Sequence, residues 1–312
     1  MKILIIGGTS FIGPCVIREL LRDSHELTVF SRGQTQCPLP ESVTHLIGDR
    51  RTLKNHRDTL RQCRPDVVID TMILTENDAA DCCEVFRGSA KRLVMISSQD
   101  VYRAYGIING SESGDIDNRP ITEDAPLRST PYPYRQPDTD PSSPLYHYDK
   151  IPAERAVLAT PDLEGVVLRL PMVYGPGDRQ HRCQGFLRQM AQAQPVISLD
   201  EAEAHWRGAR GYVEDIAHAI AMTAVMPSLP NRIYNVAETE AFSTAEWIRM
   251  LGDAFGWQGQ VTLTPPPPGT SVSPDSIQHL IVSSDRIRRD LGYTEPTDRS
   301  ERLKRTIEWE LL

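Results

Sequence analysis

This sequence of 312 residues lacks three features: a long hydrophobic run, cysteines at the C-x-x-C spacing, and an excess of positive charge. No apolar run is long enough to cross a membrane, and the apolar stretch at the N-terminus is too short for the hydrophobic region of a signal peptide. The six cysteines include no C-x-x-C pair, and the eight histidines show no ligand spacing. We therefore expect a cytoplasmic protein with reduced thiols, no metal site and no membrane partner.

Positive charge is scarce, because 34 Lys and Arg residues stand against 42 Asp and Glu residues, which gives a formal net charge of −8. Proteins that bind nucleic acid owe much of their affinity to clustered Lys and Arg, and no such stripe is visible here. The sequence thus disfavours a nucleic acid as partner and favours a small-molecule substrate.

The N-terminus carries the most informative pattern. Residues 2–6 are a lysine followed by four apolar residues, which is typical of a strand buried on both faces of a parallel sheet. Gly7, Gly8 and Gly13 follow, and the apolar spacing over 12–21 predicts a helix. Strand, glycine turn and helix together form the opening of a dinucleotide-binding unit, whose helix N-terminus binds the pyrophosphate. The alternative is an ordinary turn whose glycines serve packing alone.

Strand and helix patterns keep alternating through the first half of the chain, which predicts an α/β fold of the Rossmann type with a doubly wound parallel sheet. Further strands are expected at 26–30, 43–48, 66–70 and 92–97, and helices at 52–63 and 76–86. Ser31 and Arg32 follow the second strand, where an acidic residue would bind the ribose of NAD. An arginine there suits a 2′-phosphate, so NADP is favoured over NAD. The alternative is a solvated loop arginine.

Two motifs carry candidate chemistry. Ser98 follows the fifth expected strand, and Tyr146-x-x-x-Lys150 opens a helical stretch that continues to residue 158. On one helix, Tyr146 and Lys150 would lie one turn apart on the same face. The ammonium would favour the phenolate of Tyr146, which could then exchange a proton with a substrate alcohol or carbonyl.

In this order the motifs resemble those of the extended short-chain dehydrogenases/reductases, the superfamily of nucleotide-sugar epimerases, dehydratases and reductases. Other segments similar to that family are 169–177, 210–217, 234–236 and 284–292. The resemblance implies that Ser98 positions the substrate oxygen, Tyr146 is the acid/base, and Lys150 holds the cofactor ribose. It also implies NADP or NAD as cofactor, and a homodimer as one expected state.

The resemblance further assigns binding residues. Its implied cofactor contacts are Gly7, Thr9, Ser10, Phe11, Ile12, Gly13, Ser31, Arg32, Asp49, Lys150, Pro171 and Val173. Tyr174 and Arg210 are the implied substrate contacts, with Arg210 on a substrate phosphate. Asp49 is implied to contact the adenine, and its alternative interpretation is a turn residue.

Three departures from the family pattern matter. Ser10 replaces the middle glycine of G-x-x-G-x-x-G, so either the pyrophosphate lies less close or the serine hydroxyl binds it. Gln99 stands where dehydratases have an acid, and an amide cannot donate a proton as that acid would, which disfavours dehydration. Ser98 and Tyr146 are 48 positions apart (146 minus 98), roughly double the usual interval of the family.

The extra chain, residues 103–145, is rich in proline and predicts a long loop rather than a helix or central strand. Because its ends adjoin both catalytic motifs, we expect a lid over the substrate, with Tyr132, Tyr134 and Arg135 lining the pocket. The alternative is a surface loop without a functional role, or a contact between subunits.

The sequence predicts a dinucleotide-binding domain over 1–169, interleaved with a smaller substrate-binding subdomain over 170–312. Later helices are expected at 183–192, 214–226, 244–255 and 298–310, with a strand at 232–236 and a short polyproline segment at 265–268.

The expected protein is an NAD(P)-dependent oxidoreductase or epimerase acting on a hydroxyl or carbonyl carbon, of a nucleotide sugar or related metabolite. The alternative is an RNA-binding or regulatory protein, because the turn also resembles that of chloroplast stem-loop-binding proteins.

Overall fold

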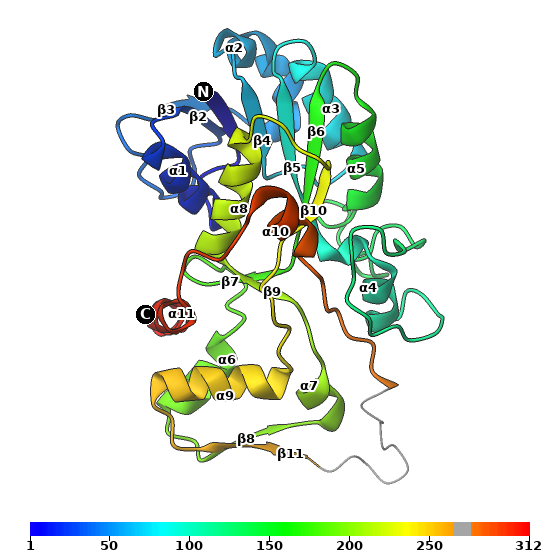
Figure 1. Ribbon diagram of the computed structural model, residues 1–312, viewed down its shortest axis with the longest axis vertical. Coiled ribbons are helices and arrows are strands. Elements are labelled where there is room, and N and C mark those ends of the chain that lie inside the picture. Colours follow the sequence, from blue (N-terminus) through cyan, green and yellow to red (C-terminus); the bar gives the residue numbers. More distant parts are fainter. Residues whose placement is uncertain (265–275) are drawn as a thin grey trace.

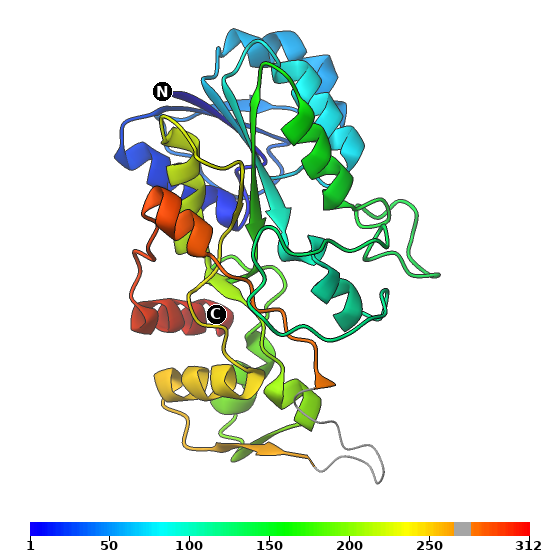
Figure 2. The ribbon, with the colours of Figure 1, turned by 45° about the vertical axis from the view of Figure 1, so that its right-hand side comes forward.

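The computed structural model describes residues 1–264 and 276–312, so the polyproline segment expected at 265–268 lies outside the described residues. An open sheet with helices on both faces forms the upper part of the molecule (Figure 1). A smaller group of helices and short strands lies below the carboxyl ends of the sheet strands, as the turned view also shows (Figure 2).

The main sheet has seven strands in the order β10-β6-β5-β4-β1-β2-β3, and every neighbouring pair is parallel. Their bounds are β1 Lys2–Ile6, β2 Glu26–Ser31, β3 Thr44–Ile47, β4 Val67–Asp70, β5 Arg92–Ser98, β6 Glu164–Leu170 and β10 Ile233–Asn235. The chain winds from β1 to one edge and then returns to build the other side. In such a doubly wound sheet, ligands bind outside the carboxyl ends of the strands where the winding reverses, which here is between β1 and β4.

The helices around this sheet are α1 Ile12–Arg22, η1 Arg50–His56, α2 Arg57–Gln62, α3 Glu76–Phe86, η2 Gln99–Val101, α4 Arg103–Ile108, α5 Lys150–Ala159, α8 Val213–Val225 and α10 Asp285–Leu291. Helix α3 begins with a capping box between Thr75 and Asp78, which satisfies two of its free N–H groups. Helices α1 and α8 pack together on one face of the sheet, and α3 and α5 pack together on the other.

The first strand is buried on both faces, as its apolar run predicts. Ile3 and Ile5 join the core on the side of α1 and α8, whereas Leu4 and Ile6 join the core on the side of α3 and α5. These four side chains are at most 1% exposed, and burying one such side chain contributes about 1.5–3 kcal/mol. Burial of this kind fixes the sheet at the position where the glycine turn leaves it.

Among the described residues, the lower part has two strand pairs and four helices. Its elements are β7 Met172–Tyr174 with β9 Arg210–Tyr212, β8 Val196–Leu199 with β11 Gln260–Leu263, and α6 Gln184–Ala191, α7 Glu201–His205, α9 Thr244–Phe255 and α11 Arg299–Glu310. Buried residues of α9, such as Trp247 and Leu251, belong to the same apolar cluster as Ile3 and Ile5 of the sheet. The two parts therefore share one continuous core.

The structure confirms the Rossmann-type sheet and places helices 76–86 and 244–255 at their expected bounds. The helix expected at 52–63 is wrong in detail, because a 3₁₀ segment precedes α2 and Thr52 lies outside helical geometry. The expectation of a loop without helix over 103–145 is also wrong in part. Helix α4 forms there because its six residues contain no proline, and the prolines come later.

Candidate active site

The glycine turn between β1 and α1 leaves room and free donors for a phosphate group. A Cβ on Gly7 would lie 2.5 Å from Met72 Cγ, and one on Gly13 would lie 2.5 Å from the backbone of Gly8. Gly7 also has a φ of +88°, which L side chains rarely adopt. Helix α1 begins without a side-chain cap and without an acidic residue in its first turn, so no side chain competes with an anion for this helix N-terminus. These residues fit a dinucleotide pyrophosphate.

Ser10 does not need the conformational freedom of a glycine. The φ of Ser10 lies outside the left-handed region, and the non-glycine residue of the turn with a positive φ is Phe11, at +47°. The carbonyl oxygen of Ser10 accepts a hydrogen bond from Gly13 N at 3.0 Å, which closes the turn. A serine therefore fits at this position without backbone strain.

A cavity of about 510 Å³ runs along the carboxyl ends of the strands beside this turn. Of the expected cofactor contacts, Gly7, Thr9, Ser10, Ser31, Arg32 and Asp49 line the cavity, whereas Phe11, Ile12, Gly13, Lys150, Pro171 and Val173 do not. Arg51, His147 and Arg179 also line it, and the sequence analysis did not single them out. Part of the insertion, from Pro141 to Pro144, lies on this cofactor cavity rather than on a separate substrate pocket.

The rim of the cavity at β2 and β3 carries several polar groups. Hydrogen bonds from the side chain and backbone of Arg51 lower the pKa of Asp49 to about 2, and the guanidinium lies 2.8 Å from Asp49 Oδ2. Ser31 Oγ lies 2.8 Å from His45 Nε2. Arg32 is exposed and forms no hydrogen bond or ion pair with any residue that the structure describes. This arginine is therefore free to pair with a ligand.

Ser98 and Lys150 meet at the carboxyl end of β5. Ser98 Oγ accepts a hydrogen bond from Asp100 N at 3.2 Å, and Lys150 is buried with its Nζ 2.9 Å from the carbonyl oxygen of Ile96. Lys150 Nζ also donates to the carbonyl oxygen of Ile73, after β4. Burial lowers the pKa of Lys150 to about 8, although Asp100 and other carboxylates oppose that change.

Tyr146 and Lys150 do not share a helix face, so that expectation is wrong. Helix α5 begins only at Lys150, because Asp149 adopts an extended conformation and caps the helix with its side chain. Tyr146 lies in the preceding turn, where the guanidinium of Arg135 is 4.2 Å from the centre of its ring. The same guanidinium is 3.8 Å from the ring centre of Tyr132. The catalytic role of Tyr146 stays a prediction.

Tyr148 is the tyrosine that the structure places beside Ser98 and Lys150. Its hydroxyl donates to Asp100 Oδ2 at 2.7 Å, and the backbone N–H of the same Asp100 donates to Ser98 Oγ. Lys150 Nζ lies 5.5 Å from the centre of the Tyr148 ring. Sequence reasoning missed Tyr148 because the Tyr-x-x-x-Lys spacing presumes a helix that had already begun at residue 146.

Asp100 joins the insertion to this cluster. Tyr134, an expected substrate contact, donates its hydroxyl to Asp100 Oδ2 at 2.8 Å, so one carboxylate oxygen accepts two phenols. Asp100 is only 2% exposed, and its Oδ1 has no hydrogen-bond partner in the described structure. The carboxylate therefore sits in a poorly solvated position, in contact with both phenols.

Arg128 is a buried residue of the insertion that bonds to residues on both sides of it in the chain. Its fully buried guanidinium donates to Asp100 O at 2.8 Å, to Asp149 Oδ1 at 2.7 Å and to Thr130 O. Glu112 accepts backbone N–H bonds from Ser129 and Thr130 on the other side. Buried side chains, together with an isolated antiparallel bridge between Tyr102 and Leu127, thus hold this segment near the end of β5.

Tyr174 and Arg210, the two other expected substrate contacts, have different hydrogen-bond partners within the protein. Tyr174 is buried and donates its hydroxyl to Glu238 Oε1 at 2.8 Å. Arg210 donates through Nη1 to two carbonyl oxygens, of Gly208 and Phe242, and lies 4.9 Å from the ring centre of Trp247. No carboxylate forms an ion pair with Arg210 in the part of the chain that the structure describes.

Several family-like motif residues form one buried polar network beneath the site. Arg169 pairs with Glu154 Oε2 at 2.7 Å and donates to Tyr102 Oη at 3.0 Å. Tyr102 in turn donates to Asn235 Oδ1 at 2.6 Å. These motif residues therefore join β6, α5 and β10 together, which is a structural role.

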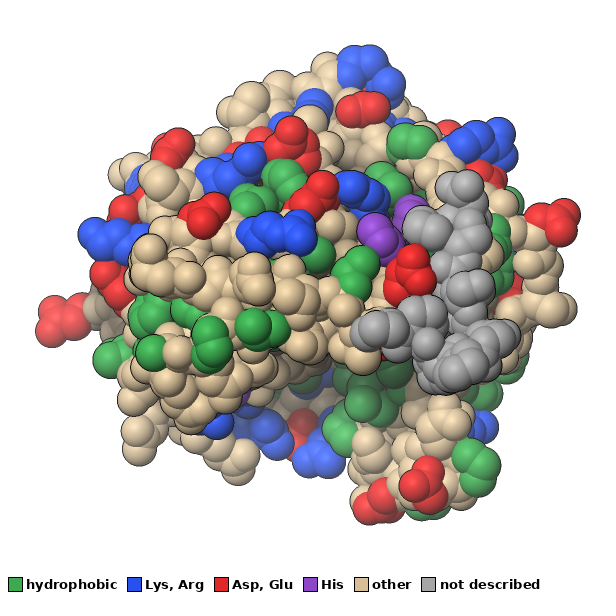
Figure 3. Space-filling view, turned by 90° about the horizontal axis from the view of Figure 1, so that it is seen from below, with side chains coloured by type: hydrophobic (Ala, Val, Ile, Leu, Met, Phe, Trp, Pro, Cys, Tyr) green, Lys and Arg blue, Asp and Glu red, His purple; other side chains and the backbone are tan. Residues whose placement is uncertain are grey.

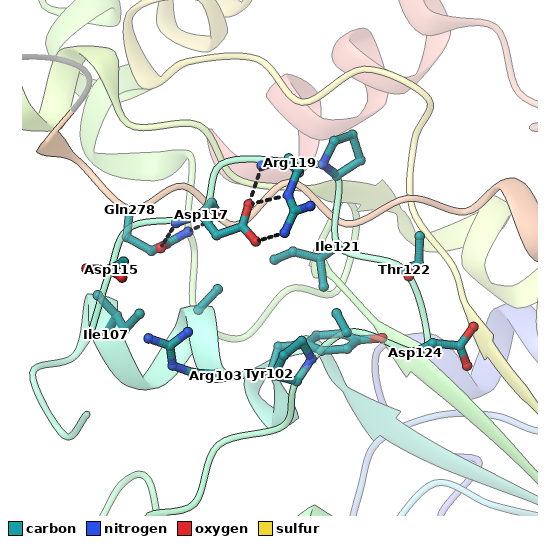
Figure 4. Close-up of a pocket in the computed structure, with 14 residues that line it drawn as sticks. Tyr102, Arg103, Ile107, Asp115, Asp117, Arg119, Ile121, Thr122, Asp124 and Gln278 are labelled. Carbon is teal, nitrogen blue, oxygen red and sulfur yellow. Dashed lines mark hydrogen bonds and ion pairs between the residues drawn. The ribbon is translucent and has the colours of Figure 1, made fainter. Parts of the chain in front are cut away.

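A second cavity of about 290 Å³ lies on the far side of the insertion, between α4 and the chain around Gln278 (Figure 4). Its Asp117 and Arg119 side chains pair with each other, and the amide of Gln278 bonds with the backbone of Asp117. The side chains of Asp117, Arg119 and Gln278 in this cavity are thus bonded within its lining.

Comparison with known proteins agrees with this geometry. Residues 3–237 match the sequence profile of the NAD dependent epimerase/dehydratase family. The chain belongs to this family. A family member needs a dinucleotide cavity at the end of β1, where the structure has it.

Among curated relatives, the chain is 28% identical over 215 residues to 2′-dehydrokanamycin reductase of Streptomyces kanamyceticus, over 66% of this chain and 53% of that one. The chain thus spans about half the length of that relative. A shorter match, 29% over 131 residues, covers 37% of this chain and 34% of the chloroplast stem-loop binding protein of 41 kDa b of Arabidopsis thaliana. Among solved structures, UDP-glucose 4-epimerase of Thermus thermophilus in complex with NAD has the same fold, with a TM-score of 0.69, 20% identity and coverage of 100% of this chain and 99% of that one.

The described residues were also compared with what a membrane span, a metal site or a disulfide requires. None of their helices has the length and apolar character needed to cross a bilayer. No group of three or more His, Cys, Asp or Glu side chains among them is arranged to hold a metal ion. All six cysteines are free thiols.

Proposed function

We propose that this protein is a nicotinamide-dependent reductase or epimerase acting on a carbonyl or hydroxyl carbon of a sugar. The observation that carries the proposal is the position of Ser98, Lys150 and the phenol of Tyr148 at the carboxyl end of β5, on the same edge of the sheet as the dinucleotide cavity, which residues after β1, β2, β3 and β4 line. A bound nicotinamide supplies or accepts the hydride. Ser98 orients the substrate oxygen, Lys150 holds positive charge at the sheet edge, and a tyrosine of the segment 146–150 moves the proton. Dehydration is disfavoured, because Gln99 is an amide.

NADP is the proposed cofactor in preference to NAD. Arg32 forms no hydrogen bond or ion pair with the described residues, although its charge acts on Asp49, and it lines the cavity with Ser31, at the place where a 2′-phosphate would lie. A charge-assisted hydrogen bond to a phosphate contributes about 1.5–3 kcal/mol. Such a contact would separate the two cofactors by at least tenfold in affinity, since about 1.4 kcal/mol corresponds to tenfold.

Fluorescence titration with NADPH and NADH tests this preference. We expect Arg32→Ala to weaken NADPH binding by about tenfold or more and to leave NADH binding nearly unchanged. Arg249→Ala, an exposed arginine of α9, is the matched control and should change neither. Tighter binding of NADH by the native protein, or an Arg32→Ala variant with undiminished affinity for NADPH, would contradict the assignment.

The proposed substrate is a nucleotide-linked sugar, and Arg210 supports this choice. A buried guanidinium without a carboxylate partner is costly, and a substrate phosphate would compensate it. The reductase relative suggests instead an amino sugar that carries no phosphate. Both share a sugar carbonyl next to the nicotinamide.

Turnover assays with two probes decide between these substrates. The native protein is incubated with NADPH and either a UDP-linked 4-ketohexose or 2′-dehydrokanamycin, and loss of nicotinamide absorbance is followed. We expect turnover of the UDP-linked probe, with a KM that rises at least tenfold in Arg210→Met because about 1.4 kcal/mol of phosphate binding is lost. Turnover of neither probe would reject the proposed function, and an unchanged KM in Arg210→Met would reject the phosphate contact.

The RNA-binding alternative has one observation in its favour, the partial match to the stem-loop binding protein. Against it stands the net charge of −8. Lys and Arg side chains are also interspersed with Asp and Glu on the face seen from below (Figure 3). Filter binding to a stem-loop RNA at modest salt tests it, and retention at micromolar protein would favour this alternative.

A further inference from the structure

The loop between β7 and α6 contributes one arginine to the cofactor cavity. Arg179 is exposed, lines the cavity, and forms no hydrogen bond or ion pair with any residue that the structure describes. The two other basic side chains of this loop already have carboxylate partners. His181 Nδ1 lies 2.8 Å from Glu310 Oε2, and Arg182 Nη1 lies 2.6 Å from Asp178 Oδ1. Arg179 is therefore the basic side chain of the loop that stays available to a ligand.

The same loop lies against the glycine turn. A Cβ on Gly177 would lie 3.4 Å from Phe11 Cα and 3.5 Å from Phe11 Cδ2, and Gly177 has a φ of +91°. Asp178, the next residue, is only 1% exposed, so the loop is packed at this point. Arg179 follows directly and lines the cavity from the side of the turn, whereas Arg32 lines it from the rim after β2.

The charges in the lining of the cavity leave two arginines over. The two carboxylates of the lining are each paired with an arginine of the lining, Asp49 with Arg51 at 2.8 Å and Asp78 with Arg50 at 3.4 Å. Arg32 and Arg179 stand outside any ion pair of the described residues. A dinucleotide with a 2′-phosphate also carries its negative charge in two groups, the diphosphate and the ribose phosphate. The number of unpaired guanidinium groups thus matches the number of phosphate groups.

We propose that Arg179 binds the diphosphate of the cofactor together with the backbone of the glycine turn. This inference rests on the proposed function and adds a contact for the same cofactor. The N-terminus of α1 supplies a positive charge of only about half an elementary unit, whereas the diphosphate carries two negative charges. A guanidinium supplies a full charge and can donate to two phosphate oxygens at once.

Two nicotinamide cofactors separate this contact from that of Arg32, because NADPH and NADH share the diphosphate and NADPH alone has the 2′-phosphate. In fluorescence titrations of the full chain, we expect Arg179→Met to weaken the binding of both by the same factor, about tenfold or more. Arg32→Ala should weaken NADPH alone. Displacement of NADPH by ADP-ribose, which has the diphosphate without the nicotinamide, should show the loss of affinity in Arg179→Met as well.

Two further variants control for charge and for packing. Arg188→Met removes an exposed arginine of α6 that does not line the cavity, and should change neither affinity. Arg179→Lys keeps the positive charge without the planar donor group, and should lose less affinity than Arg179→Met. Because the Arg179 side chain is exposed and unpaired, we expect the thermal unfolding of both its variants to match that of the native protein.

The outcomes distinguish this inference from the proposed function. Unchanged affinity for both cofactors in Arg179→Met, or a loss confined to NADPH, would overturn the inference and leave the proposed function intact. Equal losses in Arg179→Met and Arg188→Met would also overturn it, because the change in net charge alone would then account for them. A native protein that binds neither NADPH nor NADH would reject the proposed function itself, and this inference with it.

Discussion

We name the dinucleotide cavity the cofactor end and the cluster of Ser98, Asp100, Tyr148 and Lys150 the proton-transfer end, after the roles proposed for them, and the two are built in different ways. At the cofactor end, backbone makes the expected pyrophosphate site, a glycine turn and an uncapped helix N-terminus from one short stretch of chain, and side chains such as Arg32 and Asp49 form the rim. Buried side chains make the proton-transfer end, and they come from η2, the insertion and α5. The cofactor end should therefore lose stability and cofactor affinity when a side-chain atom is added to a glycine, and the proton-transfer end should lose stability when one side chain of a buried pair is removed.

The largest effect is expected at the proton-transfer end, from Arg128→Met. This change leaves the Asp149 carboxylate buried without its cation and removes three donated hydrogen bonds. Breaking a buried pair in this way costs about 3–5 kcal/mol. Urea unfolding at neutral pH measures the loss.

Arg119→Met is the matched control for that substitution. Arg119 pairs with Asp117 on the surface, with 86% of its side chain exposed, and such pairs contribute about 0–1 kcal/mol. Equal losses of stability in the two variants would mean that the insertion is not held by its buried side chains.

At the cofactor end, the corresponding change adds one atom. Gly13→Ala brings a Cβ to 2.5 Å from the backbone of Gly8, which cannot move aside as a flexible side chain would. We expect a loss of about 1–3 kcal/mol in the free energy of unfolding and weaker binding of NADPH, because the turn must open. Calorimetry and cofactor titration measure the two effects.

Gly185→Ala is the matched control in another helix, and we expect it to raise the free energy of unfolding rather than lower it. A Cβ at Gly185 of α6 meets no atom within 4 Å, and the helix gains about 0.5–1 kcal/mol from the change. If both glycine variants lost stability alike, close approach at Gly13 would not explain its effect.

The smallest effect is expected from Asp49→Asn, at the exposed rim of the cofactor end. The folded pKa of Asp49, about 2, lies below its ordinary value, so its ion pair with Arg51 stabilises the protein above about pH 4. This contribution is lost as the pH falls through the folded pKa. Since the pair is exposed, the variant should lose at most about 1 kcal/mol at pH 7 and progressively less toward pH 3. A difference in stability that stayed constant over this range would contradict the assignment.

The same comparison explains what the sequence could predict. The turn after β1 is local, so the apolar run and the glycines predicted the strand, the turn and helix α1 from their order alone, whereas the roles of the glycines and of Arg32 in cofactor binding stay predictions. The proton-transfer end depends on where α5 begins, and the Asp149 cap that sets this point is one side chain among several that could have served. Contacts such as Tyr134 with Asp100, between residues 34 positions apart, leave no periodic pattern to read.

One feature of the insertion bears on how such enzymes diversify. Residues 136–145 form hydrogen bonds only with one another and with neighbours between 132 and 148, among the residues that the structure describes. Yet four of them, Pro141 to Pro144, line the cofactor cavity. Selection could therefore rewrite this stretch freely, altering what enters the cleft while the folded scaffold keeps its stability, and a randomised library here is the natural place to seek new substrate range.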